Sequence, residues 1–122
     1  MANKKFISAV IVFLFSLCVQ AGDFSGTWTA TFDTQIGQQN YTYDFKADGN
    51  TLMGTITTPN GEAILTDGTV DGKTVTFTET LKYQGQELKI TYKGEMTSDD
   101  EISFTRNVAG MADEKLTAMR SK

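Results

Sequence analysis

Apolar and polar residues alternate along almost the whole chain after residue 21. Between residues 26 and 33 every second position is apolar or aromatic, namely Trp28, Ala30 and Phe32, and threonines separate them. A period of two places alternate side chains on opposite faces, so this pattern predicts a β-strand with one buried face. We find no convincing helical period over more than two turns. The chain is therefore predicted to be all-β.

Short turn sequences divide this alternating chain into segments. Asp48-Gly49-Asn50 and Asp71-Gly72 are hairpin signals, because glycine and asparagine tolerate the positive φ that tight turns require. Pro59-Asn60-Gly61 and Ser98-Asp99-Asp100 mark further turns. The predicted strands cover residues 26–33, 40–47, 51–58, 62–70, 73–81, 87–96, 101–106 and 114–120.

The last strand decides the architecture. Residues 107–122 fit helical spacing at Met111, Lys115 and Met119, and strand spacing at other positions. Seven antiparallel strands would leave two exposed edges, whereas an eighth strand could pair with the first and remove both. We therefore predict an eight-stranded up-and-down antiparallel barrel.

Two strands carry signs of irregular pairing. Gly54 lies in the middle of an alternating strand, which is typical of a bend or bulge. Ile64 and Val70 share one parity while Leu65 has the other, and a bulge at Asp67 and Gly68 would reconcile them. The irregularity at Gly54 is of the kind that lets a small barrel curl.

Residues 1–21 have the features of a secretory signal peptide. Lys4 and Lys5 precede an apolar run from residue 6 to 17, and small residues surround Ala21. The run of about a dozen residues is shorter than the roughly 20 that cross a membrane as a helix. We expect cleavage after Ala21, a single domain over residues 22–122, a secreted or periplasmic location, and no membrane association after cleavage.

Composition narrows the chemistry of this predicted domain. The chain has no histidine, and its one cysteine, Cys18, lies in the predicted leader. This excludes imidazole metal sites, histidine-based triads and thiol catalysis in the mature chain. Without Lys4 and Lys5, nine basic residues face 15 acidic residues, a formal charge of −6. Nucleic acids and anionic membranes are poor partners for such a chain, and we expect no cofactor and no metal.

The first strand carries a resemblance to known barrels. Gly26-Thr27-Trp28, with an arginine near the C-terminus, resembles the calycin group, which includes lipocalins, fatty-acid-binding proteins and avidins. The resemblance implies that an arginine packs across Trp28 and closes one end of the barrel, and either Arg120 or Arg106 could fill this role. We expect Arg120.

Other segments resemble small secreted bacterial domains of unassigned role. The similar segments are FDTQIGQQNYTY (residues 32–43), LKYQGQEL (81–88), EISFTR (101–106) and LTAMR (116–120). Such domains stand alone or are appended to carbohydrate-active and other secreted hydrolases. The resemblance carries no activity that could be transferred to this chain.

The predicted interior is rich in aromatic side chains. An eight-stranded barrel is just wide enough to be filled by side chains or to hold one small ligand. Several tyrosine hydroxyls on the inner face favour a polar-lined pocket, because buried hydroxyls require partners. We predict a small hydrophobic, aromatic or carbohydrate ligand. The predicted contact residues are Trp28, Phe32, Tyr41, Tyr43, Phe45, Phe77, Glu79, Tyr92, Phe104 and Arg106.

Glu79 is the notable polar residue on an apolar face. It alternates with Phe77 and Leu81, so it should point into the barrel, where an unpaired carboxylate would cost several kcal/mol. An ion pair with Arg106 or Arg120, or a hydrogen bond to Tyr43 or Tyr92, would satisfy it. Direct contact with a ligand is the alternative.

Two other function classes remain open at this stage. A small enzyme could use Glu79 as a general acid or base, but glycoside hydrolysis generally needs a second carboxylate, for which Glu62 and Glu114 are the candidates. An interaction or inhibitor module would instead contact a protein partner through loops such as residues 34–39 and 83–86. We rank ligand binding first, protein interaction second and catalysis third.

Overall fold

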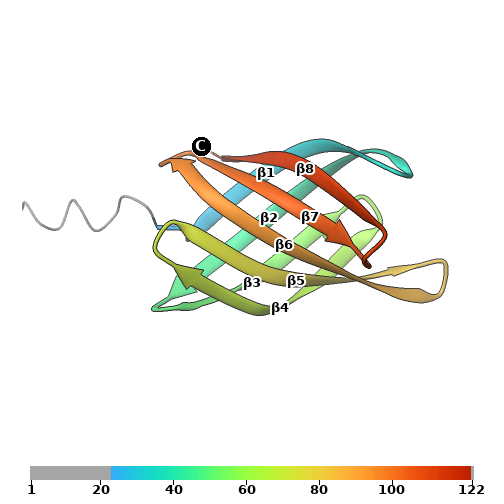
Figure 1. The fold of residues 1–122 in the computed structure, drawn as a ribbon, viewed down its shortest axis with the longest axis horizontal. Helices are drawn as coiled ribbons and strands as arrows, with labels where there is room; N and C mark the ends of the chain where they lie inside the picture. Colours follow the sequence, from blue (N-terminus) through green and yellow to red (C-terminus); the bar gives the residue numbers. More distant parts are fainter. Residues whose placement is uncertain (1–22, 122) are drawn as a thin grey trace, which may run out of the picture.

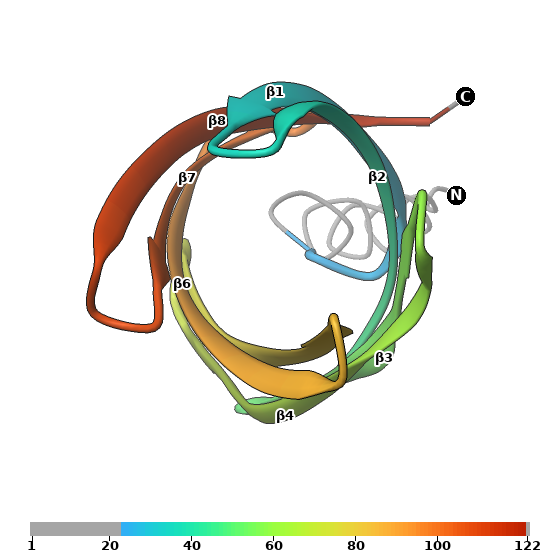
Figure 2. The same cartoon turned by 90° about the vertical axis from the view of Figure 1, so that its right-hand side faces the viewer.

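Eight antiparallel strands follow one another around a closed ring in the computed structural model, which describes residues 23–121 (Figure 1). The strands are β1 (Gly26–Thr34), β2 (Gly37–Asp48), β3 (Thr51–Thr58), β4 (Gly61–Asp71), β5 (Thr74–Tyr83), β6 (Gln86–Ser98), β7 (Glu101–Val108) and β8 (Ala112–Arg120). Each strand pairs with the next, and β1 also pairs with β8 (Figure 2). The predicted all-β, up-and-down barrel is confirmed. The predicted signal peptide lies outside the described residues.

The closing contact is the pairing of β1 with β8. Trp28 lies opposite Arg120 and Thr29 lies opposite Met119. Residues 112–120 therefore form a strand and not a helix, as the argument from exposed edges predicted. In residues 23–121 there is no helical segment of the length and apolarity that crossing a membrane would require.

The predicted irregularities are present in β3 and β4. The pairing of β3 with β4 shifts register between Thr51 and Thr55, on either side of Gly54. The pairing of β4 with β5 shifts between Thr66 and Thr69, around Asp67. Asp67 has a φ of 56°.

The bulge in β4 reconciles the two parities of that strand. Leu65, before it, and Val70, after it, both pack against the core. Ile64 is left on the outer surface, where it is 63% exposed. A sequence of mixed parity can thus keep one inner face, because one extra residue reverses the alternation.

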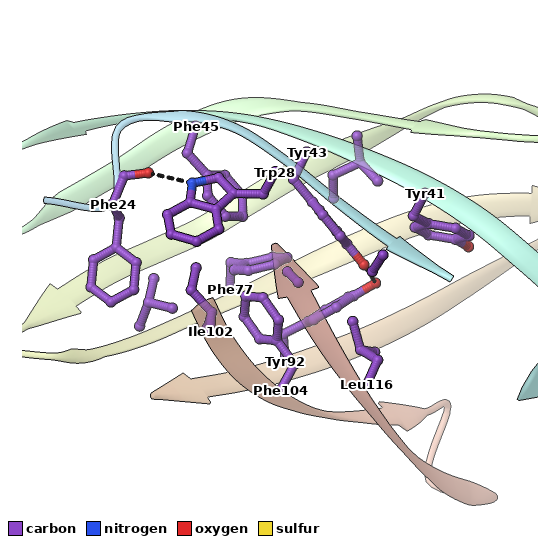
Figure 3. Packing of buried hydrophobic residues seen from close by; sticks show 14 of the residues in the cluster. Phe24, Trp28, Tyr41, Tyr43, Phe45, Phe77, Tyr92, Ile102, Phe104 and Leu116 are labelled. Atoms are coloured by element: carbon purple, nitrogen blue, oxygen red, sulfur yellow. Dashed lines mark hydrogen bonds between the residues drawn. The ribbon is translucent and has the colours of Figure 1, made fainter. Parts of the chain in front are cut away.

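One end of the barrel is closed by the segment that precedes β1. This segment crosses the lumen at the end farther from the viewer in Figure 2. Phe24 is buried there, and its carbonyl oxygen accepts a hydrogen bond of 2.9 Å from Nε1 of Trp28 (Figure 3). Trp28 has no exposed surface. Its indole N–H is therefore satisfied inside the core.

Arg120 completes the closed end from the last strand. Its Cζ lies 4.3 Å from the centroid of the Trp28 ring. Its guanidinium donates hydrogen bonds of 2.8 to 2.9 Å to the carbonyl oxygens of Asp23, Ser25 and Asp99. The structure thus places Arg120, and not Arg106, over the tryptophan.

The backbone conformation and surroundings of residue 26 explain why the Gly-x-Trp motif begins with glycine. Its φ is 132°, and a Cβ at this position would lie 2.9 Å from Nη1 of Arg120. A side chain would therefore meet both a strained backbone and the arginine that covers Trp28.

An aromatic cluster fills the part of the barrel next to the end that Phe24, Trp28 and Arg120 close. The rings of Phe77 and Tyr92 stack with centroids 4.4 Å apart, and Phe45 meets Phe77 edge-on at 5.5 Å. Phe104 packs over Gly94, where a Cβ would collide with the Phe104 ring. This half of the lumen is a packed core (Figure 3).

Candidate ligand-binding site

A pocket of about 240 Å³ opens at the end of the barrel opposite Trp28. The hairpins that join β1 to β2, β3 to β4, β5 to β6 and β7 to β8 turn at this end (Figure 1). Its apolar lining consists of Ile36, Leu81, Leu88, Ile90, Val108 and Met111. Its polar lining consists of Thr34, Gln35, Gln39, Tyr41, Asn60, Arg106 and Glu114. Ile36 is 50% and Met111 71% exposed.

A buried hydrogen-bond network joins the floor of this pocket to the core, with Glu79 as its central acceptor. Oε1 of Glu79 accepts from the Tyr92 hydroxyl at 2.7 Å and from a terminal nitrogen (NH2) of Arg106 at 3.3 Å. Oε2 accepts from the Tyr41 hydroxyl at 3.1 Å. Glu79 has no exposed surface. Three donors thus replace the water that the carboxylate loses on burial.

The hydrogen bonds of the Tyr43 and Tyr92 hydroxyls each have a defined donor and acceptor. The Tyr92 hydroxyl donates to Glu79, accepts from Nε of Arg106 at 2.8 Å, and lies 2.8 Å from the Tyr43 hydroxyl. Since a hydroxyl has one proton, Tyr43 is the donor to Tyr92. Figure 3 shows these two hydroxyls meeting, with Tyr41 farther along the barrel.

Arg106 connects the network to the pocket wall. Its Nη1 donates to Oε1 of Glu114 at 2.6 Å, and its Nη2 donates to the Tyr41 hydroxyl at 3.2 Å as well as to Glu79. Arg106 is only 2% exposed, and its Cζ lies 4.9 Å from the ring centroid of Phe32. The guanidinium is therefore held between two carboxylates and among aromatic faces.

Strand register brings these groups together. Phe77 lies opposite Tyr92, Tyr92 opposite Arg106, and Arg106 opposite Glu114, which makes one inward-facing row across β5, β6, β7 and β8. Directly opposed residues on one face of a sheet have neighbouring side chains. The Arg106–Glu114 ion pair thus follows from the hairpin that joins β7 to β8.

The environment shifts the pKa values of the network in one direction. Burial raises the pKa of the Tyr43 and Tyr92 hydroxyls well above the usual range. Burial, followed by the nearby Glu79 carboxylate, raises the pKa of Tyr41. Burial acts against the charge of Arg106, but Tyr92 and Glu79 more than offset it, so the pKa of Arg106 is also raised. At neutral pH the tyrosines are neutral and the guanidinium is charged.

These shifts predict how stability depends on pH. Unfolded tyrosines lose their protons near pH 10, whereas Tyr41, Tyr43 and Tyr92 keep theirs in the barrel to higher pH. The free energy of unfolding should therefore be insensitive to these groups below about pH 10. Above it, stability should fall by up to about 1.4 kcal/mol per pH unit for each tyrosine. Urea unfolding between pH 8 and 11.5 measures this loss.

Tyrosinate absorbance at 295 nm provides the matching control. At pH 10.5 the native barrel should show at most one of its four tyrosines titrating, and the protein in urea should show all four. Titration of all four near pH 10 with an intact near-ultraviolet circular dichroism spectrum would contradict the prediction.

The ten predicted ligand contacts do not share one chamber. Two of them, Tyr41 and Arg106, line the pocket. The others lie outside that lining, within or beside the packed core: Trp28, Phe32, Tyr43, Phe45, Phe77, Glu79, Tyr92 and Phe104. The expected aromatic lumen is thus divided into a filled aromatic half and a pocket with mainly aliphatic walls.

The sequence left two roles open for Glu79, internal pairing and direct contact with a ligand, and the structure shows internal pairing. Glu79 pairs with Arg106 and with Tyr92, and the sequence reasoning missed its third partner, Tyr41. Of the two possible second carboxylates, Glu114 points inward beside Arg106, and Glu62 is exposed.

Sequence reasoning also missed the aliphatic pocket wall. Leu81, Leu88 and Ile90 follow inward parity, but nothing in the alternation distinguishes a side chain that lines a pocket from one that fills a core. Ile36 and Met111 lie near turns. The sequence feature that could have marked them as pocket residues is the presence of an apolar side chain next to a turn. Among residues 23–121, no group of three or more histidine, cysteine, aspartate or glutamate side chains is arranged to hold a metal ion.

Comparison with known proteins adds a structural neighbour. No protein-family model and no curated protein sequence matches this chain. Among solved structures, a redesigned β-barrel, mFAP1, bound to DFHBI, is similar to it with a TM-score of 0.52. The two chains are 14% identical, and the match covers 80% of this chain and 94% of the other. At this identity the likeness concerns the fold alone.

Proposed function

We propose that this protein is an exported barrel that binds one small, largely apolar molecule in the pocket at its open end. The observation that carries the proposal is the difference between the two ends. Phe24, Trp28 and Arg120 close one end, and the other holds a pocket of about 240 Å³ above a buried polar network. Ligand pockets typically combine apolar walls with a few ordered polar groups.

The structural neighbour supports the same reading. mFAP1 is a β-barrel of similar fold and is bound to DFHBI. A barrel of this size is wide enough for one small molecule when side chains do not fill it completely. The exposed side chains of Ile36 and Met111 at the rim provide an apolar entrance.

Glu79 has a positioning role in this proposal. Its carboxylate does not line the pocket, but it holds Tyr41 and Arg106, which do. A ligand would meet the outer side of this network. We therefore favour binding over acid–base catalysis by Glu79.

Export rests on the N-terminal sequence. Lys4 and Lys5, the apolar run and the small residues near Ala21 support a cleaved signal peptide, and we propose that residues 22–122 form the mature domain in a secreted or periplasmic location. The position of Arg120 over Trp28, beside Gly26, supports a relationship to the calycin barrels.

Native mass spectrometry of the protein recovered from exporting cells tests location and binding together. We expect a polypeptide that begins near Gly22 and carries a bound small molecule. Leu88→Trp places a large ring in the pocket wall and should reduce the bound fraction at least tenfold. Lys89→Trp introduces the same ring on the outer face of the next residue and should leave binding unchanged. Equal occupancy in the two variants would place binding outside the pocket and contradict the binding proposal. A recovered polypeptide that still contains residues 1–21 would contradict the proposed cleavage and export.

A further inference from the structure

The charges in the pocket lining and directly beneath it are unbalanced. Among the residues that line it, Arg106 and Glu114 are the charged ones. Arg106 contacts Glu114 at 2.6 Å and Glu79 at 3.3 Å, so one positive charge serves two carboxylates. The neighbouring tyrosines are neutral at ordinary pH, and burial raises their pKa values further. With the buried Glu79 carboxylate included, this group carries two carboxylates for one guanidinium.

Arg106 has little capacity left to bind an anion. Four of its five N–H groups already donate: the one on Nε to Tyr92, one on Nη1 to Glu114, and the two on Nη2 to Tyr41 and Glu79, which leaves one N–H on Nη1. Turning the guanidinium toward a ligand carboxylate would break contacts that are almost fully buried. Such contacts are costly to lose without replacement.

Glu114 has unused capacity on the pocket side. Its Oε1 accepts from Arg106, and its side chain is 9% exposed. Within residues 23–121, its second oxygen, Oε2, accepts no hydrogen bond, and Glu114 lines the pocket. A carboxylate oxygen without a donor, in a site largely shielded from water, favours a positively charged or hydrogen-bond-donating group.

We infer that the pocket binds primary alkylamines in their ammonium form, in preference to carboxylates of the same size, and that Glu114 receives the ammonium group. The aliphatic walls of Leu81, Leu88, Ile90 and Val108 take the alkyl chain. This inference rests on the proposed binding function and specifies its ligand class.

A matched series of probes tests the inference: octylammonium, 1-octanol and octanoate at pH 7.5 and low salt. Each is titrated into the protein while the methyl resonances of Leu88 and Ile90 are followed by NMR, so that binding is assigned to the pocket. We expect octylammonium to bind at least tenfold more tightly than octanoate, with 1-octanol between them. The neutral alcohol reports on the pocket independently of charge.

Glu114→Gln tests the receiving group. The variant keeps the shape of the side chain but removes its charge, so octylammonium affinity should fall at least fivefold and 1-octanol affinity should change less than twofold. Glu87→Gln removes the same charge from an exposed position at the same end of the barrel and should leave all three affinities unchanged.

The outcomes separate the two proposals. Octanoate binding as tightly as octylammonium, with shifts of the pocket methyls, would overturn the preference for amines and leave the pocket as the binding site. Absence of methyl shifts with all three probes would overturn pocket binding itself. If Glu114→Gln does not fold, the order of affinities in the unmodified protein still decides the preference.

Discussion

Arg106→Met is expected to lower the free energy of unfolding by about 3 to 5 kcal/mol, the range found when one partner of a buried ion pair is removed. The variant leaves Glu79 and Glu114 without their shared cation, in a part of the barrel where Glu79 has no exposed surface. Tyr92 and Tyr41 also lose a donor each. Urea unfolding followed by tryptophan fluorescence measures the loss, since Trp28 is the single tryptophan.

Two further variants identify the cause of this loss. Lys93→Met likewise replaces a cationic side chain with methionine, but on the exposed face of β6 next to Tyr92, and should change stability by less than about 0.5 kcal/mol. Adding Glu79→Gln and Glu114→Gln to Arg106→Met removes the uncompensated charges and should recover part of the stability. A loss below about 1 kcal/mol for Arg106→Met would show that the network does not stabilise the barrel.

Arg120→Ala is expected to cost about 2 to 3 kcal/mol at the other end of the barrel. The arginine donates hydrogen bonds to three backbone carbonyl groups and covers the face of Trp28. Hydrogen bonds to charged groups and cation–π contacts each contribute about 1 to 2 kcal/mol when partly shielded from water. Its side chain is 25% exposed, and water can reach some of the freed carbonyls. The expected loss is therefore smaller than the sum of these separate contributions. Thermal and urea unfolding measure the effect.

Arg120→Lys is the informative companion variant. Lysine keeps the charge but lacks the planar fork that reaches the carbonyls of Asp23, Ser25 and Asp99, so it should restore less than half of the loss. Lys115→Ala, on the exposed face of β8, should have little effect. If Arg120→Ala were as stable as the unmodified protein, the pairing of β1 with β8 would close the barrel without help from the Arg120 hydrogen bonds and its contact with Trp28.

Much of the fold could be predicted from local patterns. Alternation identified the strands, and turn residues identified several of the hairpins. The two-parity pattern in β4 located a bulge at Asp67 and Gly68. Closure followed from the need to remove two strand edges, and the Gly26-Thr27-Trp28 step indicated the strand that the last one must meet. These features depend on residues close in sequence or on general properties of sheets.

The candidate site was only partly predictable. The inward parity of Glu79 required a partner, and Arg106 and Tyr92 were among those considered. Parity could not reveal that Tyr41 is a third partner, or that Glu114 lies opposite Arg106. Those contacts depend on the register of each hairpin, because a period of two determines the face of a residue but not its neighbour across the strands.

Alternation, turn residues and the need to remove strand edges were enough to predict a closed, eight-stranded barrel with an aromatic interior and a carboxylate that must be paired. It took the folded barrel to show that Trp28 and Phe77 belong to a packed core, whereas Leu88 and Ile90 line a pocket. All of these side chains have inward parity. What separates them is their height along the barrel axis, which closure and register set together, and their height determines whether the lumen around them is filled.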